Sequence, residues 1–188
     1  MQFTTNARRL VTGGVAAGTF ALLATGVAVA SDINGTQGSD NLRGTSAADQ
    51  IDGRGGNDII KGFGGDDVLL GGPGNDIMQG GGDLGEDLMF GGIGRDQAYG
   101  GKGRDGMYGG PGADIFVGGP GRDTGDVRGH DHVFLGAGRD YMTLLHNDGV
   151  SAFIDCGPGR DLVTYLVSRD TRDRLVNCEV VRVENPGD

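Results

Sequence analysis

Single apolar residues recur along the chain every nine residues, each at the centre of a three-residue stretch whose outer members vary more. Because successive side chains of a strand point to opposite faces, this spacing predicts short strands that each bury one central residue. Gly125 interrupts the series. The predicted central residues are Leu42, Ile51, Ile60, Leu69, Met78, Met89, Ala98, Met107 and Phe116. Together they describe a thin, continuous core.

A glycine-rich turn ending in aspartate precedes each predicted strand, and Gly71–Asp76 (Gly-Gly-Pro-Gly-Asn-Asp) is one complete copy. The aspartates keep the nine-residue phase, apart from a two-residue insertion between Gly80 and Asp87. They are Asp40, Asp49, Asp58, Asp67, Asp76, Asp87, Asp96, Asp105, Asp114 and Asp123. Calcium takes roughly six to eight oxygen ligands from carboxylates and backbone carbonyls, and glycines let a short turn aim its carbonyls inward. The pattern therefore predicts calcium-binding turns, and it argues against a disordered glycine-rich linker.

The motif resembles the RTX (hemolysin-type) calcium-binding nonapeptide repeat over residues 35–126. The resemblance implies an all-β, right-handed parallel β-roll, a β-solenoid with two copies per coil. Odd copies would form one sheet and even copies the other. It also implies that each ion lies between two stacked turns. The lower turn would give its second and fourth carbonyls and its Asp, and the upper turn its first and third carbonyls and its Asp. Binding would be coupled to folding outside the cell.

This resemblance assigns ligands residue by residue. One site would join Gly72, Gly74 and Asp76 to Gly91, Ile93 and Asp96, and the next would join Gly92, Gly94 and Asp96 to Gly109, Pro111 and Asp114. On the other edge, Gly101, Gly103 and Asp105 would meet Gly118, Pro120 and Asp123, while Asp58, Asp67 and Asp87 would serve further sites. Counting ligands over the well-formed turns gives about six Ca²⁺ ions.

Some turns depart from the motif. The turns beginning at Gly35 and Gly44 contain Thr36, Thr45 and Ala47 in place of glycines, so we expect weak or empty sites and a capping role there. Arg54 and Phe63 each replace a second glycine but keep its carbonyl. The occupancy of the turns near Asp40, Asp49, Asp140 and Asp161 stays open.

The region after Asp126 continues the pattern in degenerate form, and we divide the chain into a roll at 31–126 and degenerate coils with a C-terminal β cap at 127–188. Ala137 and Pro158 are interpreted as replacing second glycines. Cys156 and Cys178 are expected to pair and pin the last strand, the alternative being two free buried thiols. The arrangement around these cysteines resembles the ending of small exported bacterial RTX-repeat proteins.

Residues 1–30 have the pattern of an export signal peptide: Arg8 and Arg9, an apolar stretch, and a small-x-small site at Ala28–Ala30. The alternative is a membrane anchor; with cleavage, the mature form would not span a membrane. The net charge is −10, and cleavage would remove two arginines and no acid. Such acidity argues against nucleic acid as a partner. The expected location is secreted, extracellular or at the cell surface.

Catalytic motifs are absent from the sequence: it has no His-Glu-x-x-His and no Gly-x-Ser-x-Gly. His130, Asp131 and His132 alternate, which suits a transition-metal site or, more simply, a polar turn.

Because neither catalytic motif occurs, we expect a non-enzymatic calcium-binding protein. The alternatives are an adhesion or interaction module that binds an extracellular protein or cell-surface polysaccharide through an outward apolar sheet face, an accessory module for an enzyme on another chain, and a carbohydrate-acting β-solenoid enzyme. The predicted outward apolar residues are Val68, Leu70, Leu88, Phe90 and Tyr108 on one sheet and Ile59, Ile77, Tyr99, Ile115 and Val117 on the other.

Overall fold

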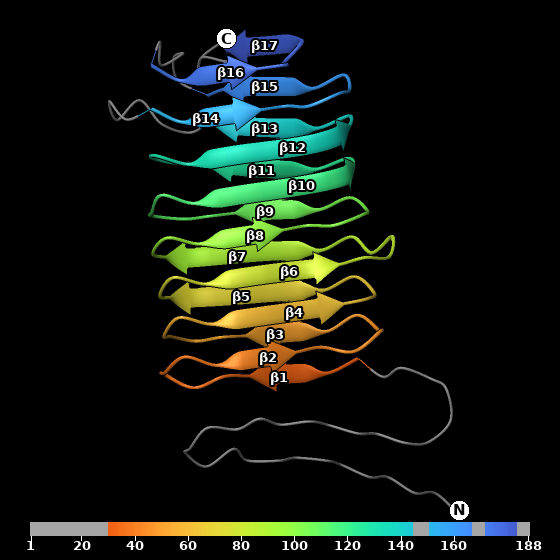
Figure 1. Ribbon diagram of the computed structural model, residues 1–188, viewed down its shortest axis with the longest axis vertical. Coiled ribbons are helices and arrows are strands. Elements are labelled where there is room, and N and C mark those ends of the chain that lie inside the picture. Colours follow the sequence, from red (N-terminus) through yellow and green to blue (C-terminus); the bar gives the residue numbers. More distant parts are fainter. Residues whose placement is uncertain (1–29, 145–150, 167–171, 184–188) are drawn as a thin grey trace, which may run out of the picture.

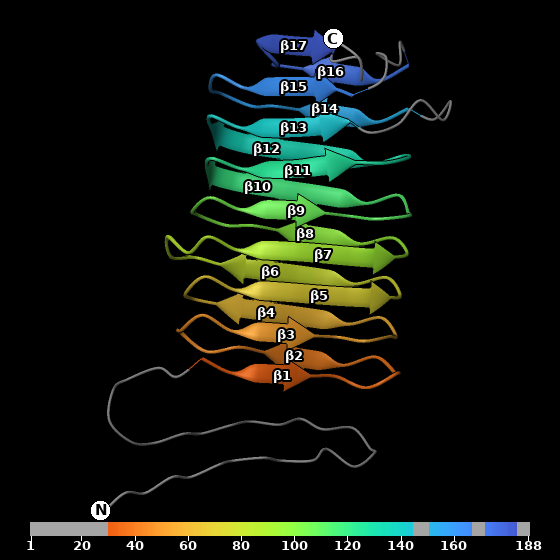
Figure 2. The same ribbon diagram turned by 180° about the vertical axis from the view of Figure 1, so that it is seen from behind.

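The computed structural model describes residues 30–144, 151–166 and 172–183, and these form a single stack of parallel strands. The chain alternates between two sheets, so that β1 and β17 lie at opposite ends of the stack (Figures 1 and 2). One sheet has nine strands in the order β1-β3-β5-β7-β9-β11-β13-β15-β17, and the other has eight, in the order β16-β14-β12-β10-β8-β6-β4-β2. Every neighbouring pair is parallel. The parallel β-solenoid and the division of odd and even copies between two sheets are confirmed.

The strands are short, as the triplet pattern predicts. The nine-stranded sheet contains β1 (Asp32–Asn34), β3 (Gln50–Asp52), β5 (Val68–Pro73), β7 (Leu88–Ile93), β9 (Gly106–Tyr108), β11 (Thr124–Val127), β13 (Tyr141–Leu144), β15 (Leu162–Tyr165) and β17 (Val180–Val183). The eight-stranded sheet contains β2 (Asn41–Arg43), β4 (Ile59–Phe63), β6 (Ile77–Gly81), β8 (Gln97–Tyr99), β10 (Ile115–Gly121), β12 (His132–Gly138), β14 (Phe153–Asp155) and β16 (Arg174–Val176). Both sheets continue past residue 126 with the same pairing.

The core between the two sheets is a narrow stack of the central side chains of the strands. The central residues pair in register from coil to coil, for example Leu69 with Met89 and Ile60 with Met78. All the predicted central residues are buried except Leu42, which is partly buried in the second strand of the stack. A Cβ placed on Gly125 would lie 3.2 Å from Cε of Met142, so the methionine of the next coil occupies the space that Gly125 leaves.

The C-terminal coils carry a wider core than the nonapeptide copies. Leu135, Leu144, Ala152, Cys156 and Tyr165 join the central residues Val133, Met142, Ile154 and Val163 in it. Cys156 and Cys178 form a disulfide with 5.1 Å between their Cα atoms. It ties the turn after β14 to the turn before β17, which confirms the predicted pairing.

The register corrects one detail of the sequence interpretation. Gly136 pairs with Gly119, which is a second-position glycine, and Ala137 pairs with Pro120 in the third position. The residue that replaces a glycine in this turn is therefore Leu135, at the first position, and Cys156 replaces the first glycine in the next turn of the same edge. The two-glycine spacing Gly-x-Gly fits two registers in sequence, and burial of Leu135 and Cys156 in the core selects this one.

Residues 1–29 lie outside the described part, so the predicted signal peptide is not seen. Within the described segments, no helix is long and apolar enough to cross a membrane.

Candidate metal centres

The turns between strands form two edges of the solenoid, and each edge stacks one turn per coil. We call the turns that lead from odd- to even-numbered strands the first edge and those that lead back the second edge. The first edge carries Asp40, Asp58, Asp76, Asp96, Asp114, Asp131 and Asp173, and the second carries Asp49, Asp67, Asp87, Asp105, Asp123, Asp140, Asp161 and Glu179. Within a turn, positions are counted from one to six, so that Gly71 is position one and Asp76 is position six.

The position-six aspartates are joined along each edge by a repeated hydrogen bond. The backbone N–H of each Asp donates to Oδ1 of the Asp one coil later, as from Asp76 to Asp96 at 2.8 Å and from Asp105 to Asp123 at 3.0 Å. On the second edge this chain of bonds runs without a break from Asp49 to Asp161, whose N–H donates to Oε2 of Glu179 at 2.8 Å. The carboxylates are thereby fixed in one orientation, with Oδ1 already used.

The second carboxylate oxygen, Oδ2, is what distinguishes these turns. It is buried and accepts no hydrogen bond in Asp58, Asp67, Asp76, Asp96, Asp105, Asp114, Asp123, Asp140 and Asp161. A buried polar atom without a hydrogen-bond partner costs ~1–3 kcal/mol in a neutral group and more in a charged one. A buried carboxylate oxygen carries this cost unless a cation or a hydrogen-bond donor contacts it. Nine such atoms aligned on two edges are candidate ligands for cations.

Three turns that depart from the motif supply their own donors to Oδ2 of the aspartate. In the turn of Asp49, the backbone N–H and the hydroxyl of Thr45 both donate to Oδ2, at 2.5 and 3.0 Å. Thr36 makes the same two bonds to Asp40, and the N–H of Arg128 donates to Oδ2 of Asp131 at 2.8 Å. These three carboxylates are satisfied by their own turns, and they leave no oxygen that needs an outside cation.

Backbone carbonyls crowd the same turns. A Cβ built on Gly94 would lie 1.6 Å from the carbonyl oxygen of Gly74, and one built on Gly92 would lie 2.2 Å from that of Gly72. Side chains at these positions would displace carbonyls that stack along the edge. The third-position carbonyl of Ile93 accepts the N–H of Gly74 at 2.8 Å, and the first-position carbonyl of Gly109 accepts that of Gly92 at 2.8 Å. A carbonyl has two lone pairs, so each of these oxygens keeps one for a metal.

Residues 34–62, 61–98 and 90–124 match the family model of the RTX calcium-binding nonapeptide repeat, in four copies. Residues 34–124 therefore belong to this RTX repeat family. No curated protein matches it. The matched segments cover turns of both edges from Gly35 to Asp123, and they end before the coils that carry Asp131, Asp140 and Asp161. Membership of the RTX family implies calcium binding in a β-roll.

Each predicted RTX ligand set falls on consecutive turns of one edge. Asp76 and Asp96 lie in neighbouring coils of the first edge with Asp114 next, and Asp105 and Asp123 lie in neighbouring coils of the second. Among the described residues no three His, Cys, Asp or Glu side chains converge to hold a metal. A cation here would therefore be bound by two Asp side chains together with carbonyl oxygens, which is the ligand mixture that suits calcium.

The insertion in the Asp87 turn leaves the column of carboxylates intact. Asp67 still donates its N–H to Oδ1 of Asp87, at 3.0 Å. A Cβ on Gly85 would meet the carbonyl of Gly65, so Gly85 takes position four and the extra residues bulge outward, with Leu84 81% exposed. Oδ2 of Asp83 accepts the N–H of Gly65 at 3.0 Å. Asp83 thus forms a hydrogen bond to the preceding turn of the same edge, that of Asp67, and lies outside the column of position-six aspartates.

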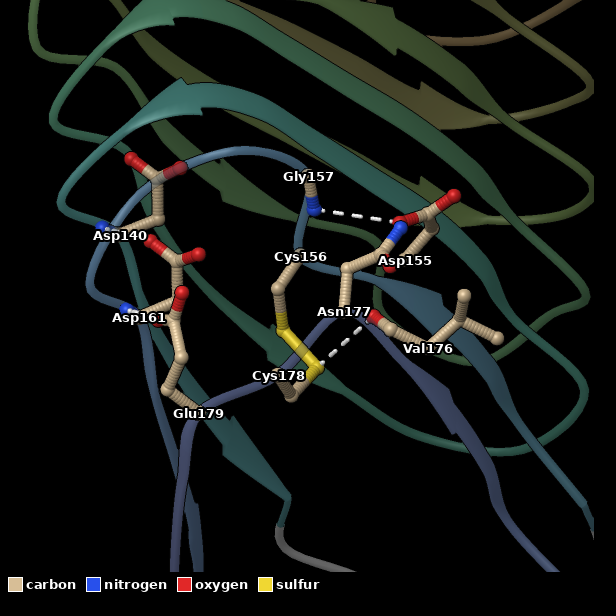
Figure 3. The surroundings of a disulfide bond; sticks show 9 residues. All are labelled: Asp140, Asp155, Cys156, Gly157, Asp161, Val176, Asn177, Cys178 and Glu179. Carbon is tan, nitrogen blue, oxygen red and sulfur yellow. Dashed lines mark hydrogen bonds between the residues drawn. A yellow bond between two sulfur atoms is a disulfide. The ribbon is translucent and has the colours of Figure 1, made fainter.

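Sequence reasoning did not assign the C-terminal continuation of the second edge as a site. Figure 3 shows Asp140, Asp161 and Glu179 in one column beside the Cys156–Cys178 disulfide. Asp140 and Asp161 are buried, and their Oδ2 atoms are unpaired like those of the RTX-matched turns. On the first edge, by contrast, the buried Ala152 takes position six between Asp131 and Asp173, so the column of acids is interrupted there.

Burial raises the pKa of the position-six aspartates whose Oδ2 is unpaired, and that of Asp87. The pKa of Asp96 and that of Asp114 rise to about 6, and the pKa of Asp87 and that of Asp123 rise to about 7. Loss of solvent is the main cause, the N–H donated from the coil below partly offsets it, and repulsion from acids in neighbouring coils adds to the rise. Near pH 6 to 7 these carboxyl groups are therefore partly protonated, and a cation would compete with those protons.

The alternating histidines do not form a site with Asp131. Asp131 is buried and bonded to Arg128 and Asp114, whereas His130 and His132 are exposed. The ring of His132 lies against Phe153, with 5.9 Å between ring centroids. The geometry favours the polar-turn interpretation.

Proposed function

We propose that this chain binds several calcium ions between stacked turns of both edges, and that this binding drives its folding. The unpaired, buried Oδ2 atoms carry the proposal, because each points to a cation that the protein itself does not supply. The proposed ligands are those of the RTX resemblance: Gly72, Gly74, Asp76, Gly91, Gly92, Ile93, Gly94, Asp96, Gly109, Pro111 and Asp114 on the first edge, and Gly101, Gly103, Asp105, Gly118, Pro120 and Asp123 on the second. Asp58, Asp67 and Asp87 serve further sites.

About six ions are proposed, by ligand counting over the well-formed turns. The turns of Asp40 and Asp49 stay weak or empty, because Thr36 and Thr45 already satisfy their carboxylates. Most of the aspartates between two well-formed turns would be shared by two ions.

Coupled folding follows from the thin core. Each coil buries only two central side chains, and the entropy of ordering a coil exceeds what so few contacts return. Cation binding then supplies the missing free energy, because ions that bind only the folded state stabilise it. Repeats of this family are typically structural rather than catalytic and typically extracellular. The export signal proposed for residues 1–30 fits folding outside the cell, where calcium is abundant.

The test is a calcium titration of the chain without residues 1–30, followed by far-ultraviolet circular dichroism and by isothermal calorimetry. We expect a largely disordered chain in chelator, β-structure at millimolar calcium, and a stoichiometry near six. Magnesium is the matched control and should substitute poorly, because it demands shorter bonds and keeps its waters. A folded spectrum that does not change with calcium would overturn the proposal.

A second role, calcium-dependent interaction through an apolar sheet face, is favoured by one contact. Phe90 and Tyr108 stack on the outer face of the nine-stranded sheet with 5.1 Å between ring centroids, and Phe90 is 37% exposed. Val68, Leu70 and Leu88 lie half-buried beside them. Replacing Phe90 and Tyr108 with Ser should abolish adsorption to an extracellular partner without changing the calcium titration; a loss of calcium binding in this variant would instead assign the pair a structural role.

A further inference from the structure

The upper half of the second edge carries a column of arginines that the calcium sites do not use. Arg104, Arg122, Arg139 and Arg160 occupy position five of four successive turns. The glycines that precede them pair directly, Gly103 with Gly121, Gly121 with Gly138, and Gly138 with Gly159. The four arginines therefore lie one above another, about 4.8 Å apart along the stack.

These arginines have no partners within the protein as far as it is described. All four are exposed, and none makes an ion pair or a side-chain hydrogen bond to a described residue. The one ion pair among those residues joins Arg128 to Asp126 on the other edge, at 3.2 Å. Like charges stacked this closely repel one another, and no described acid forms a direct ion pair with them.

Three of the arginines line a shallow hollow. Its volume is about 190 Å³, and its charged lining is Arg122, Arg139, Arg160 and Arg182, with Asp140 and Asp161 behind them. Tyr141 and Leu162 complete it. Arg182 comes from β17, so the basic surface extends to the last coil.

The coil itself does not require arginine at position five. On the first edge that position holds Ser39, Asn57, Asn75, Arg95, Ala113, His130, Ser151 and Arg172, so its two arginines are not neighbours. Asn57 and Asn75 there accept backbone N–H groups of the next coil at 2.8 Å. Lower on the second edge it holds Asp66 and Glu86. The positive column is thus a property of one half of one edge, in a chain whose net charge is −10.

We propose that this arginine column binds an acidic polysaccharide that lies along the stack. Guanidinium groups recognise carboxylate and sulfate oxygens through two parallel hydrogen bonds, and a regular column of them suits a linear chain of regularly spaced anionic groups. Tyr141 and Leu162 give the hollow an apolar floor against which sugar rings can pack. The hollow contains a single aromatic side chain, whereas single-stranded nucleic acids are bound on a series of stacking aromatic residues.

A second copy of the chain is the less favoured partner. The acids at the lower end of the same edge are Asp66, Asp83 and Glu86, fewer than the arginines. Two of them already accept backbone hydrogen bonds: Asp83 from Gly65 and Asp66 from Glu86. An antiparallel copy would therefore leave part of the column without a partner.

Calcium strengthens this surface, a step that rests on the proposed function. Each arginine is followed directly by a buried aspartate, namely Asp105, Asp123, Asp140 or Asp161. Ions bound to those carboxylates would remove the negative charge behind the column, so the surface becomes more positive once the sites are filled.

The experiment measures binding of the calcium-loaded protein to fluorescent dextran sulfate, hyaluronate, neutral dextran and a single-stranded oligodeoxynucleotide, at about 0.15 M salt. The test variant is Arg139→Gln/Arg160→Gln, and the matched control is Arg95→Gln, which alters position five on the opposite edge. Circular dichroism and size-exclusion chromatography of the same samples report folding and oligomeric state. If the test variant fails to fold, Arg104→Gln/Arg122→Gln replaces it.

We expect binding to the acidic polysaccharides only, weakened about tenfold or more in the double variant and changed less than about twofold in the control, since charge-assisted pairs are lost in one and not in the other. Equal losses in both variants, or no binding by the folded protein, would overturn the proposal. So would tighter binding of the oligonucleotide, or a dimer that disappears with the arginines. A protein that folds and binds polysaccharide without calcium at neutral pH would refute calcium-coupled folding and leave the arginine column standing.

Discussion

At the scale of single residues, the fate of one carboxylate oxygen separates two kinds of turn. Where position two is threonine, as in the turn of Asp49, its N–H and hydroxyl satisfy Oδ2. Where the turn follows the glycine motif, as at Asp96, Oδ2 is buried and unpaired. The second kind is expected to depend on a cation for its stability, and the first is not.

Asp96→Ala should therefore reduce calcium stoichiometry and raise the calcium midpoint of folding severalfold. Asp96 lies in the middle of the first edge, holds the N–H of Asp76, and is placed to bridge two ions. Asp83→Ala and Asp66→Ala are the matched controls, because these acids lie outside the position-six column. Asp49→Ala should also be mild. Calorimetry on the four variants checks the ranking, and equal effects would mean that the assigned register is wrong.

Phe63→Gly should stabilise the calcium-loaded protein. Phe63 sits at position two with φ of 84°, a conformation that glycine adopts freely and that costs a bulky side chain about 1–2 kcal/mol. Its side chain is 47% exposed, so little packing is lost. Thermal unfolding in saturating calcium should show a higher Tm. As a control, Gly72→Phe, at a glycine with φ of 98°, should lower it. An unchanged or lower Tm for Phe63→Gly would show that the ring contributes more than the strain.

At the scale of elements, the two edges end differently. The second edge keeps its acid column to Glu179 and is closed by the Cys156–Cys178 bond, while the first loses its acid at Ala152. The side chain of Asn177, at φ of 56°, donates to Oδ1 of Asp155 at 2.8 Å, and the N–H of Gly157 donates to the same oxygen at 3.1 Å. The last coil is therefore held by a covalent bond and by a small polar network.

Removing the disulfide should loosen the C-terminal coils first. In the chain-entropy model a loop of this size contributes roughly 3 kcal/mol, and a terminal coil has only one neighbour to stabilise it. In Cys156→Ser/Cys178→Ser with saturating calcium, hydrogen exchange should accelerate across residues 151–166 and 172–183 and change little between Asp76 and Asp105. Uniform acceleration, or two free thiols in the native protein, would contradict this account.

The sequence predicted the strands well where the aspartate and the central apolar residue repeat in the same phase, and poorly where that phase is lost. Aspartate and the central apolar residue repeat together through Phe116, and this double phase sets both the strand positions and the pairing of odd and even copies. After Asp126 the glycines alone had to fix the register, and they placed Ala137 and Pro158 one position too early. The hydrogen bonds of Thr36 to Asp40 and of Thr45 to Asp49 lie within single turns, but they depend on the folded conformation of the turn, which the residue types alone do not give. The alignment of the arginines depends on pairing between successive coils and carries no local signal.

At the scale of the whole molecule, the roll has a column of buried acids along each edge and an apolar core between its two sheets. Its position-six aspartates can be neutralised by calcium or by protons. The pKa of Asp67 rises to about 6 for the same reasons as that of Asp96, with burial first, so the effect is spread over both edges. Calcium and protons should therefore compete for the same oxygens, and calcium binding near neutral pH should release protons.

The calcium-free chain should consequently be more stable in mild acid than at neutral pH. These carboxyl groups have pKa values of about 6 to 7 in the coil, against roughly 3.9 for an unfolded aspartate. The folded state thus binds more protons, and the stability that this gives is complete below pH ~4 and lost as the pH rises through about 6 to 7. In calcium-free buffer the β-signal in circular dichroism should be larger at pH 5 and should fall towards that of a disordered chain by pH 7.5. Saturating calcium should remove this dependence of stability on pH, because the ions replace the protons.

Asp96→Asn/Asp123→Asn, which mimics the protonated groups, should flatten the pH profile of the calcium-free chain, while Asp66→Asn should leave that profile unchanged. A calcium-free chain that is more stable at pH 7.5 than at pH 5 would show that the position-six carboxylates are stabilised as anions by something other than a bound cation.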